Sequence, residues 1–171
     1  LESPLDLSYN VGNGQARLSP FCLRRQEGGL VCSEEEINAS AQQGSAVLSV
    51  REVPMEMAEP FLPEEWQLEG DTTADLAANW RQGGAQWQAD LRILSDLAIT
   101  AINDFGQPVE LPRISIDAQV EANQAQADAN IQLSLAEVGE LGLTLSINDP
   151  IGEGGLSGEL SADDVSLAPY R

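Results

Sequence analysis

Residues 114–148 read ISIDAQVEANQAQADANIQLSLAEVGELGLTLSIN, and their apolar side chains fall at every second position. Even positions carry them from Ile114 to Ala122, and odd positions carry them from Ala125 to Leu135 and from Leu141 to Ile147. This period of two is typical of strands covered on one face, because successive side chains of a strand point to opposite sides of a sheet. A helix would need apolar residues three and four positions apart, and only alanines provide that spacing here. The stretch predicts three consecutive strands.

The same alternation predicts how the first two strands pair. A two-residue turn at Asn123-Gln124 would set Ala122 opposite Ala125, Val120 opposite Ala127, Ile116 opposite Ile131 and Ile114 opposite Leu133. A slip by one residue would place each apolar side chain opposite a polar one, so the pairing is well specified. Asn-Gln is a poor two-residue turn, since such turns prefer Asn-Gly.

A second hairpin is centred on Gly83-Gly84, a pair that suits the type I′ turn of two-residue hairpin loops. This turn predicts three pairs: Trp80 with Trp87, Leu76 with Leu91, and Asp75 with Arg92 on the other face. The alternation continues to Ala101, so the second strand is either long or bulged near Ser95-Asp96.

Shorter alternating runs fill the rest of the chain. We expect strands in 5–11, 16–23, 30–32, 37–41, 46–50 and 156–162, a short helical turn in 55–62, and a loop over 103–112. The connections are short, which suits antiparallel neighbours in one meandering, all-β sheet of about a dozen strands. No amphipathic helix is present to cover the apolar face, so a sandwich, a closed barrel or a sheet folded lengthwise must do so.

The charge and the missing residue types exclude several functions. The net charge is −20, and the sequence has neither lysine nor histidine. An acidic chain is repelled by nucleic acid and by anionic membranes. Catalysis that needs an imidazole is excluded, and the scattered acidic residues show no distinct pair for glycoside hydrolysis. We therefore expect no catalytic residues, no metal site and no cofactor.

Cys22 and Cys32 flank the turn signal Gly28-Gly29 in the segment FCLRRQEGGLVCS. Their separation suits a cross-link within a hairpin, and such a disulfide would stabilise the fold by about 2.5–3 kcal/mol through loop closure. A disulfide would place the protein in an oxidising compartment, whereas reduced thiols would fit the cytosol. A two-cysteine metal site would lack further ligands.

If the sheet folds on itself, its apolar residues would line a groove. Strands of nine to eleven residues would give an apolar wall roughly 30 Å long, comparable to the hydrocarbon thickness of a bilayer. The expected groove lining consists of Leu76, Trp80, Trp87, Leu91, Ile93, Leu97, Ile99, Ile114, Ile116, Val120, Ile131, Leu133, Leu135, Leu141, Leu143, Leu145, Ile147, Leu156 and Leu160.

Two segments carry a family resemblance. The segment VREVPMEMAEPFLPEEWQLEGDTTADLAANW, from Val50, resembles the strand, "LP", short helix, "LP" and strand arrangement of the TamB family. QPVELPRISIDAQVEA resembles the family's recurring "LP" element before alternating strands. Related AsmA-like proteins share these motifs.

The resemblance implies an open, taco-like antiparallel sheet with a hydrophobic concave face, forming one β-rich segment over residues 1–171 of a longer periplasmic protein. It implies an inner-membrane anchor helix outside this chain, the outer-membrane protein TamA as partner, and no catalytic residues. The expected function is a non-enzymatic conduit or chaperone for phospholipid acyl chains or unfolded outer-membrane protein strands. The alternative is a structural stalk segment of an adhesin or autotransporter with a filled core.

Overall fold

The central stretch forms three antiparallel strands of ten residues each, as predicted. They are β10 (Ile114–Asn123), β11 (Gln126–Leu135) and β12 (Gly139–Asn148). The structure is a computed structural model that describes residues 5–26, 28–63, 65–103, 105–152, 154–163 and 165. The remaining strands are β1 (Leu7–Asn10), β2 (Gln15–Leu18), β3 (Phe21–Arg24), β4 (Leu30–Ser33), β5 (Ile37–Ala39), β6 (Gly44–Pro54), β7 (Trp66–Arg81), β8 (Gln86–Ile102), β9 (Pro108–Glu110) and β13 (Leu156–Asp163).

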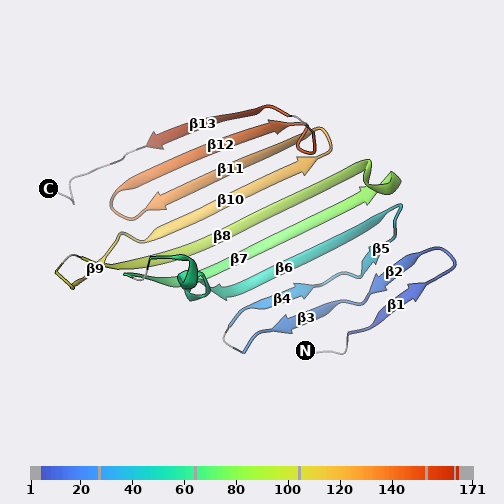
Figure 1. Ribbon diagram of the computed structural model, residues 1–171, viewed down its shortest axis with the longest axis horizontal. Coiled ribbons are helices and arrows are strands. Elements are labelled where there is room, and N and C mark those ends of the chain that lie inside the picture. Colours follow the sequence, from blue (N-terminus) through green and yellow to red (C-terminus); the bar gives the residue numbers. More distant parts are fainter. Residues whose placement is uncertain are drawn as a thin grey trace.

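All the described strands join one open antiparallel sheet (Figure 1). Its order is β1-β2-β5-β6-β7-β8-β10-β11-β12-β13, with β3 paired to β4, β4 to β6, and β9 to β8. Each long strand lies beside its neighbour in sequence, which is the arrangement that short connections favour. The predicted all-β meander is confirmed, and the sheet does not close into a barrel.

The β7–β8 hairpin has the predicted register. Trp80 faces Trp87, Leu76 faces Leu91 and Asp75 faces Arg92. Gly83 has φ 66° and ψ 25°, and Gly84 has φ 90°. Positive φ at both central residues is what a type I′ turn requires, and only glycine adopts it without steric cost. β8 is long and keeps its register with β7, so the bulge considered near Ser95-Asp96 is not formed.

The β10–β11 hairpin keeps the predicted faces but shifts its register by two residues. Ala122 faces Ala127 rather than Ala125, Val120 faces Ala129, Ile116 faces Leu133, and Ile114 faces Leu135. The reason is the turn: the Oδ1 atom of Asn123 accepts hydrogen bonds from the backbone N–H groups of Ala125 and Gln126, at 2.8 and 3.0 Å. This side-chain turn moves the loop to Gln124-Ala125, while the even shift leaves apolar side chains opposite apolar ones.

The amino-terminal part departs most from the prediction. The expected strand over 16–23 is broken at Ser19-Pro20 into β2 and β3, which have different partners. Proline lacks the N–H that a ladder needs, so the ladder is interrupted there. The expected disulfide is present: Cys22 faces Cys32 across β3 and β4, and the two are bonded.

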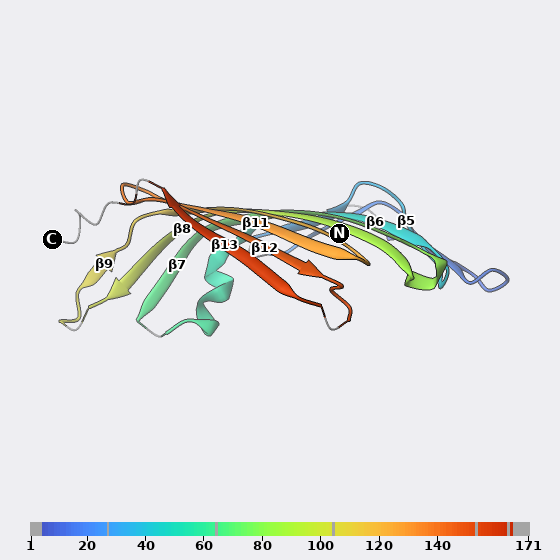
Figure 2. The same ribbon diagram turned by 90° about the horizontal axis from the view of Figure 1, so that it is seen from above.

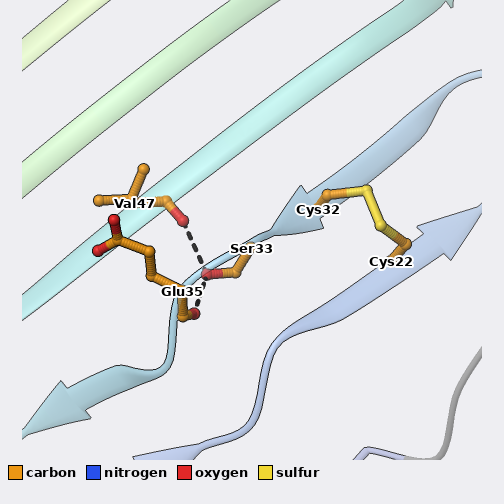
Figure 3. Close-up of a disulfide and its surroundings, with 5 residues drawn as sticks. All are labelled: Cys22, Cys32, Ser33, Glu35 and Val47. Carbon is orange, nitrogen blue, oxygen red and sulfur yellow. Dashed lines mark hydrogen bonds between the residues drawn. A yellow bond between two sulfur atoms is a disulfide. The ribbon is translucent and has the colours of Figure 1, made fainter.

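Ser33 is the last residue of β4, just before β5, and these two strands pair with different segments of β6. Its side chain is 1% exposed, and its hydroxyl donates to the carbonyl oxygens of Val47 and Glu35, which lie at 2.7 and 2.8 Å (Figure 3). A hydroxyl has one donor hydrogen, so the two carbonyls share it. β6 therefore keeps a hydrogen-bond partner between the segment that pairs with β5 and the segment that pairs with β4.

The short helical turn predicted in 55–62 is the 3-10 helix η1 (Met55–Phe61). The loop expected over 103–112 contains the short strand β9 (Pro108–Glu110), which the sequence did not reveal because it begins with a proline and lies between Gly106 and Pro112. A register shift does occur in the sheet, but in β6 between Val50 and Val53, where Glu52 has φ 50°.

The sheet is a single layer, bent so that its ends curve toward the same side (Figure 2). Among the described residues, the buried apolar side chains are only Cys32, Leu68, Leu97 and Val138. A layered domain would bury one full face of the sheet against a second element. Here the described elements leave most of the apolar face half-exposed.

We predict that Ser33→Ala lowers the free energy of unfolding by about 0.5–1.5 kcal/mol, the net contribution of a typical intramolecular hydrogen bond. Urea unfolding followed by circular dichroism measures the change. Ser45→Ala, at an exposed position of β6, is the control and should change stability by less than about 0.5 kcal/mol. Equal effects of the two substitutions would show that the Ser33 bridge is unimportant.

We also predict that Gly70→Ala destabilises the fold by about 2 kcal/mol or more, because the new methyl group meets backbone. Gly70 has φ 132°, and a Cβ atom there would lie 1.9 Å from the carbonyl oxygen of Asp96. Gly155→Ala is the matched control, since nothing lies within 4 Å of its Cβ position. Thermal unfolding compares the two, and a neutral Gly70→Ala would contradict the tight β7–β8 contact.

Candidate functional site

The candidate site is the apolar face of the sheet, which the cross-strand register makes continuous. Residues directly opposite in an antiparallel ladder point to the same side. Leu76 faces Leu91, Leu91 faces Val120, and the row continues across β10 to Ala129 and Leu145. A second row joins Ile93, Ala118, Ile131, Leu143 and Leu160. Side chains from six strands therefore share one face.

The structure places every residue of the expected groove lining on this face, with different exposure along it. Leu97 is buried, Leu156 and Leu160 at the β13 edge are 67% and 72% exposed, and Ile147 is 36% exposed. The others are half-buried, namely Leu76, Trp80, Trp87, Leu91, Ile93, Ile99, Ile114, Ile116, Val120, Ile131, Leu133, Leu135, Leu141, Leu143 and Leu145.

Two tryptophans mark one end of the apolar face. Trp80 lies over Gly44, where a Cβ atom would be 2.1 Å from the indole ring, and its Nε1 donates to the carbonyl oxygen of Ser40 at 3.2 Å. Trp87 faces Trp80 across the hairpin. The Nε1 atom of Trp87 is buried and has no hydrogen-bond partner in the described residues. The glycine thus lets a large ring lie flat at this end.

At the other end, η1 lies on the apolar face. The hydroxyl of Thr72, which shares this face with Ala74 and Leu76, donates to the Sδ atom of Met55 at 2.8 Å. Figure 2 shows η1 on the inner side of the bend. The apolar face is therefore turned toward the inside of the curved sheet at this end.

The opposite face is polar and carries three arginine–carboxylate pairs. Arg51 bonds Asp75 at 2.5 Å, Arg92 bonds Asp117 at 2.9 Å, and Arg113 bonds Asp96 at 3.3 Å. The hydrogen bond and the charge of Asp117 raise the pKa of Arg92. Hydrogen bonds from Ser146 and then Gln126 lower the pKa of Asp128, so this carboxyl stays ionised. Each of these pairs is solvent-exposed and contributes little to stability.

The polar face also has shallow hollows. One is lined by polar-face side chains of β10 to β13, including Gln119, Asp128, Asn130 and Glu159. A twisted sheet is saddle-shaped, so each face is hollowed along one diagonal. This hollow brings together carboxylates, amides and hydroxyls without a basic group, and Leu145 is its one residue from the predicted groove lining. Other hollows on this face include Arg92 or Arg113.

Sequence analysis missed apolar-face residues near the amino terminus and beneath η1. Leu18 faces Ile37, Leu48 faces Leu76, and Leu68 faces Ile99, all on the candidate face. Their alternation is visible in the sequence, but the break at Pro20 and the acidic run before Ile37 conceal the common phase. Thr72 and Ser95 interrupt the face with a hydrogen bond of 2.8 Å between their hydroxyls.

Within the part of the chain that the structure describes, no three acidic, histidine or cysteine side chains gather in a way that would hold a metal ion. None of the described helices has the length and apolar character needed to cross a membrane.

A family model described as "TamB, N-terminal domain" matches residues 1–171, which confirms the resemblance seen in the "LP" segments. No solved structure matches the chain significantly. The chain therefore belongs to the TamB family, whose members are non-enzymatic components of outer-membrane assembly, are anchored in the inner membrane, extend into the periplasm and work with TamA.

Proposed function

We propose that this chain is a periplasmic conduit segment whose apolar face shields phospholipid acyl chains or unfolded outer-membrane protein strands from water. In the full-length protein it would act without enzymatic chemistry, between the inner membrane and TamA. The observation that carries the proposal is a one-sided apolar face that runs across the sheet and stays half-exposed.

Apolar surface exposed to water raises the free energy of the protein. Covering it stabilises a complex by about 25 cal/mol per Å². A face of this extent on a folded protein usually marks a binding surface. The long strands give it length: β10, β11 and β12 each have ten residues, about 33 Å at 3.3 Å per residue.

The strongly acidic composition also supports the proposed conduit role. With a net charge of −20, the polar face keeps the segment soluble and repels copies of itself. The groove-lining positions of the apolar face hold no charged side chain. An acyl chain that covers them would therefore not have to remove water from an ion.

A structural stalk segment is the alternative, and it requires a filled core. The scarcity of buried apolar side chains among the described residues favours the conduit over the stalk. Unfolded strands would have a further contact, because among the described residues β13 pairs with β12 alone, and all eight residues of β13 are exposed. An extended client strand can add to such an edge.

We predict that Leu143→Glu weakens acyl-chain binding by at least about tenfold, since it removes a leucine contact of about 1.5–3 kcal/mol and adds a charge to the apolar face. Leu143 is central, facing Ile131 and Leu160. Native mass spectrometry after incubation with phospholipid, and displacement of a fluorescent fatty acid, measure the binding.

Thr144→Glu is the matched control, because it adds the same charge one residue along β12, on the polar face. It should leave binding unchanged, and circular dichroism should show both variants folded. If a folded Leu143→Glu protein binds acyl chains as well as the Thr144→Glu protein does, the apolar face is not the binding surface.

A further inference from the structure

We propose that η1 is a hinged strap that opens from the apolar face to admit a ligand at the β7 end of the sheet. This inference rests on the proposed function and adds to it a control point. The ligand is a long acyl chain. The strap separates a short part of the apolar face, at Leu68 and Ile99, from the rest of that face.

The strap begins where β6 leaves the sheet. β6 pairs with β7 only as far as Pro54, which faces Asp71, and η1 then takes the place of β6 beside the first residues of β7. There the backbone N–H of Leu68 donates to Oε1 of Glu59 at 3.4 Å. A side chain of the strap therefore substitutes for the ladder that β6 no longer provides.

The strap lies beside the part of β7 that contains Leu68, one of the buried apolar residues. Leu68 is 6% exposed and Leu97 is 8% exposed, whereas most of the face is half-exposed. Both lie near the contact between Met55 and the hydroxyl pair Thr72–Ser95. With the strap in place, the apolar strip ends at these hydroxyls; with the strap raised, it continues through Leu68 and Ile99.

Little of the strap is buried. None of the residues of η1 is buried, Met57 is 45% exposed and Phe61 is 89% exposed. Its polar contacts include two hydrogen bonds to methionine sulfur, from Thr72 to Met55 and from Arg25 to Met57, and the long bond to Glu59. Segments with so little burial open at low free-energy cost.

The sequence next to the strap provides a hinge. The register shift between Val50 and Val53 and the positive φ of Glu52 interrupt the β6–β7 ladder. The ladder resumes for only two residues, Val53 and Pro54, before the strap begins. Proline at position 54 sets the direction of the chain into η1, and Pro60 lies inside it. The strap is thus joined to the sheet by an interrupted strand rather than by a continuous ladder.

The test is a covalent bridge between the strap and β7. In Met55→Cys/Thr72→Cys, the two thiols stand at positions whose native side chains are in contact, and dibromobimane joins them without reducing the Cys22–Cys32 disulfide. Uptake of a fluorescent long-chain fatty acid is followed by stopped flow. The bridged protein should take up the probe at least about tenfold more slowly than the same variant labelled with monobromobimane, because a closed strap removes the binding-competent state.

The control is Ser45→Cys/Asn79→Cys, which bridges β6 to β7 on the polar face, away from the strap. Its bridged and unbridged forms should take up the probe equally. If the native chain takes up the probe and the Met55–Thr72 bridge changes nothing, the strap proposal is overturned while the proposed function stands.

If the native chain does not bind the probe, the acyl-chain part of the proposed function is overturned, and hydrogen exchange then tests the strap without any ligand. Amides of residues 55–61 and of Leu68 should exchange faster than those of Ala74 to Trp80, because the strap opens locally. Equal protection of the two regions from hydrogen exchange would overturn the strap proposal.

Discussion

Everything in this structure depends on one constraint, which is that side-chain parity is preserved across each antiparallel ladder of the described sheet. Because opposite residues point to the same side, a strand with alternating polarity can join the sheet only in registers that keep apolar side chains together. The two-residue shift at β10–β11 illustrates this, since it changes every pair in the hairpin and leaves both faces intact. Parity, rather than any single contact, separates an acidic face from an apolar one.

The consequence is a fold stabilised mainly by its ladders and by cross-strand contacts rather than by an enclosed core. The amino-terminal edge is secured by the Cys22–Cys32 disulfide and by the Ser33 hydroxyl, at the place where the ladder is interrupted. Because the described part of the chain places only η1 over the apolar face, that face remains available. The family to which the chain belongs acts in outer-membrane assembly, and the half-exposed apolar face is the basis of the binding role that we propose within it.

The register of a hairpin could be predicted from the sequence in one case and not in the other, depending on which groups form the turn. Gly83-Gly84 marks the centre of a hairpin loop, so the register from Trp80–Trp87 to Asp75–Arg92 could be read from the sequence. At β10–β11 the turn is set by the Asn123 side chain, whose choice between neighbouring N–H groups does not follow from the pattern. Asp75 does face Arg92, yet Arg92 bonds Asp117 and Asp75 bonds Arg51, since the ion pairs form diagonally.

The sequence by itself determined the alternation, the long strands and the phase of the apolar residues from β7 to β13, because these follow from period-two geometry and short connections. It favoured the Cys22–Cys32 disulfide, which the structure confirms. Only the tertiary structure decided how the broken strands β2 to β5 divide among their partners, and where η1 lies on the sheet. The physical reason is separation along the chain. Alternation of side chains is a local property of residues two positions apart. The position of η1 instead depends on where β6 ends beside β7, which is set by contacts between residues far apart in the chain.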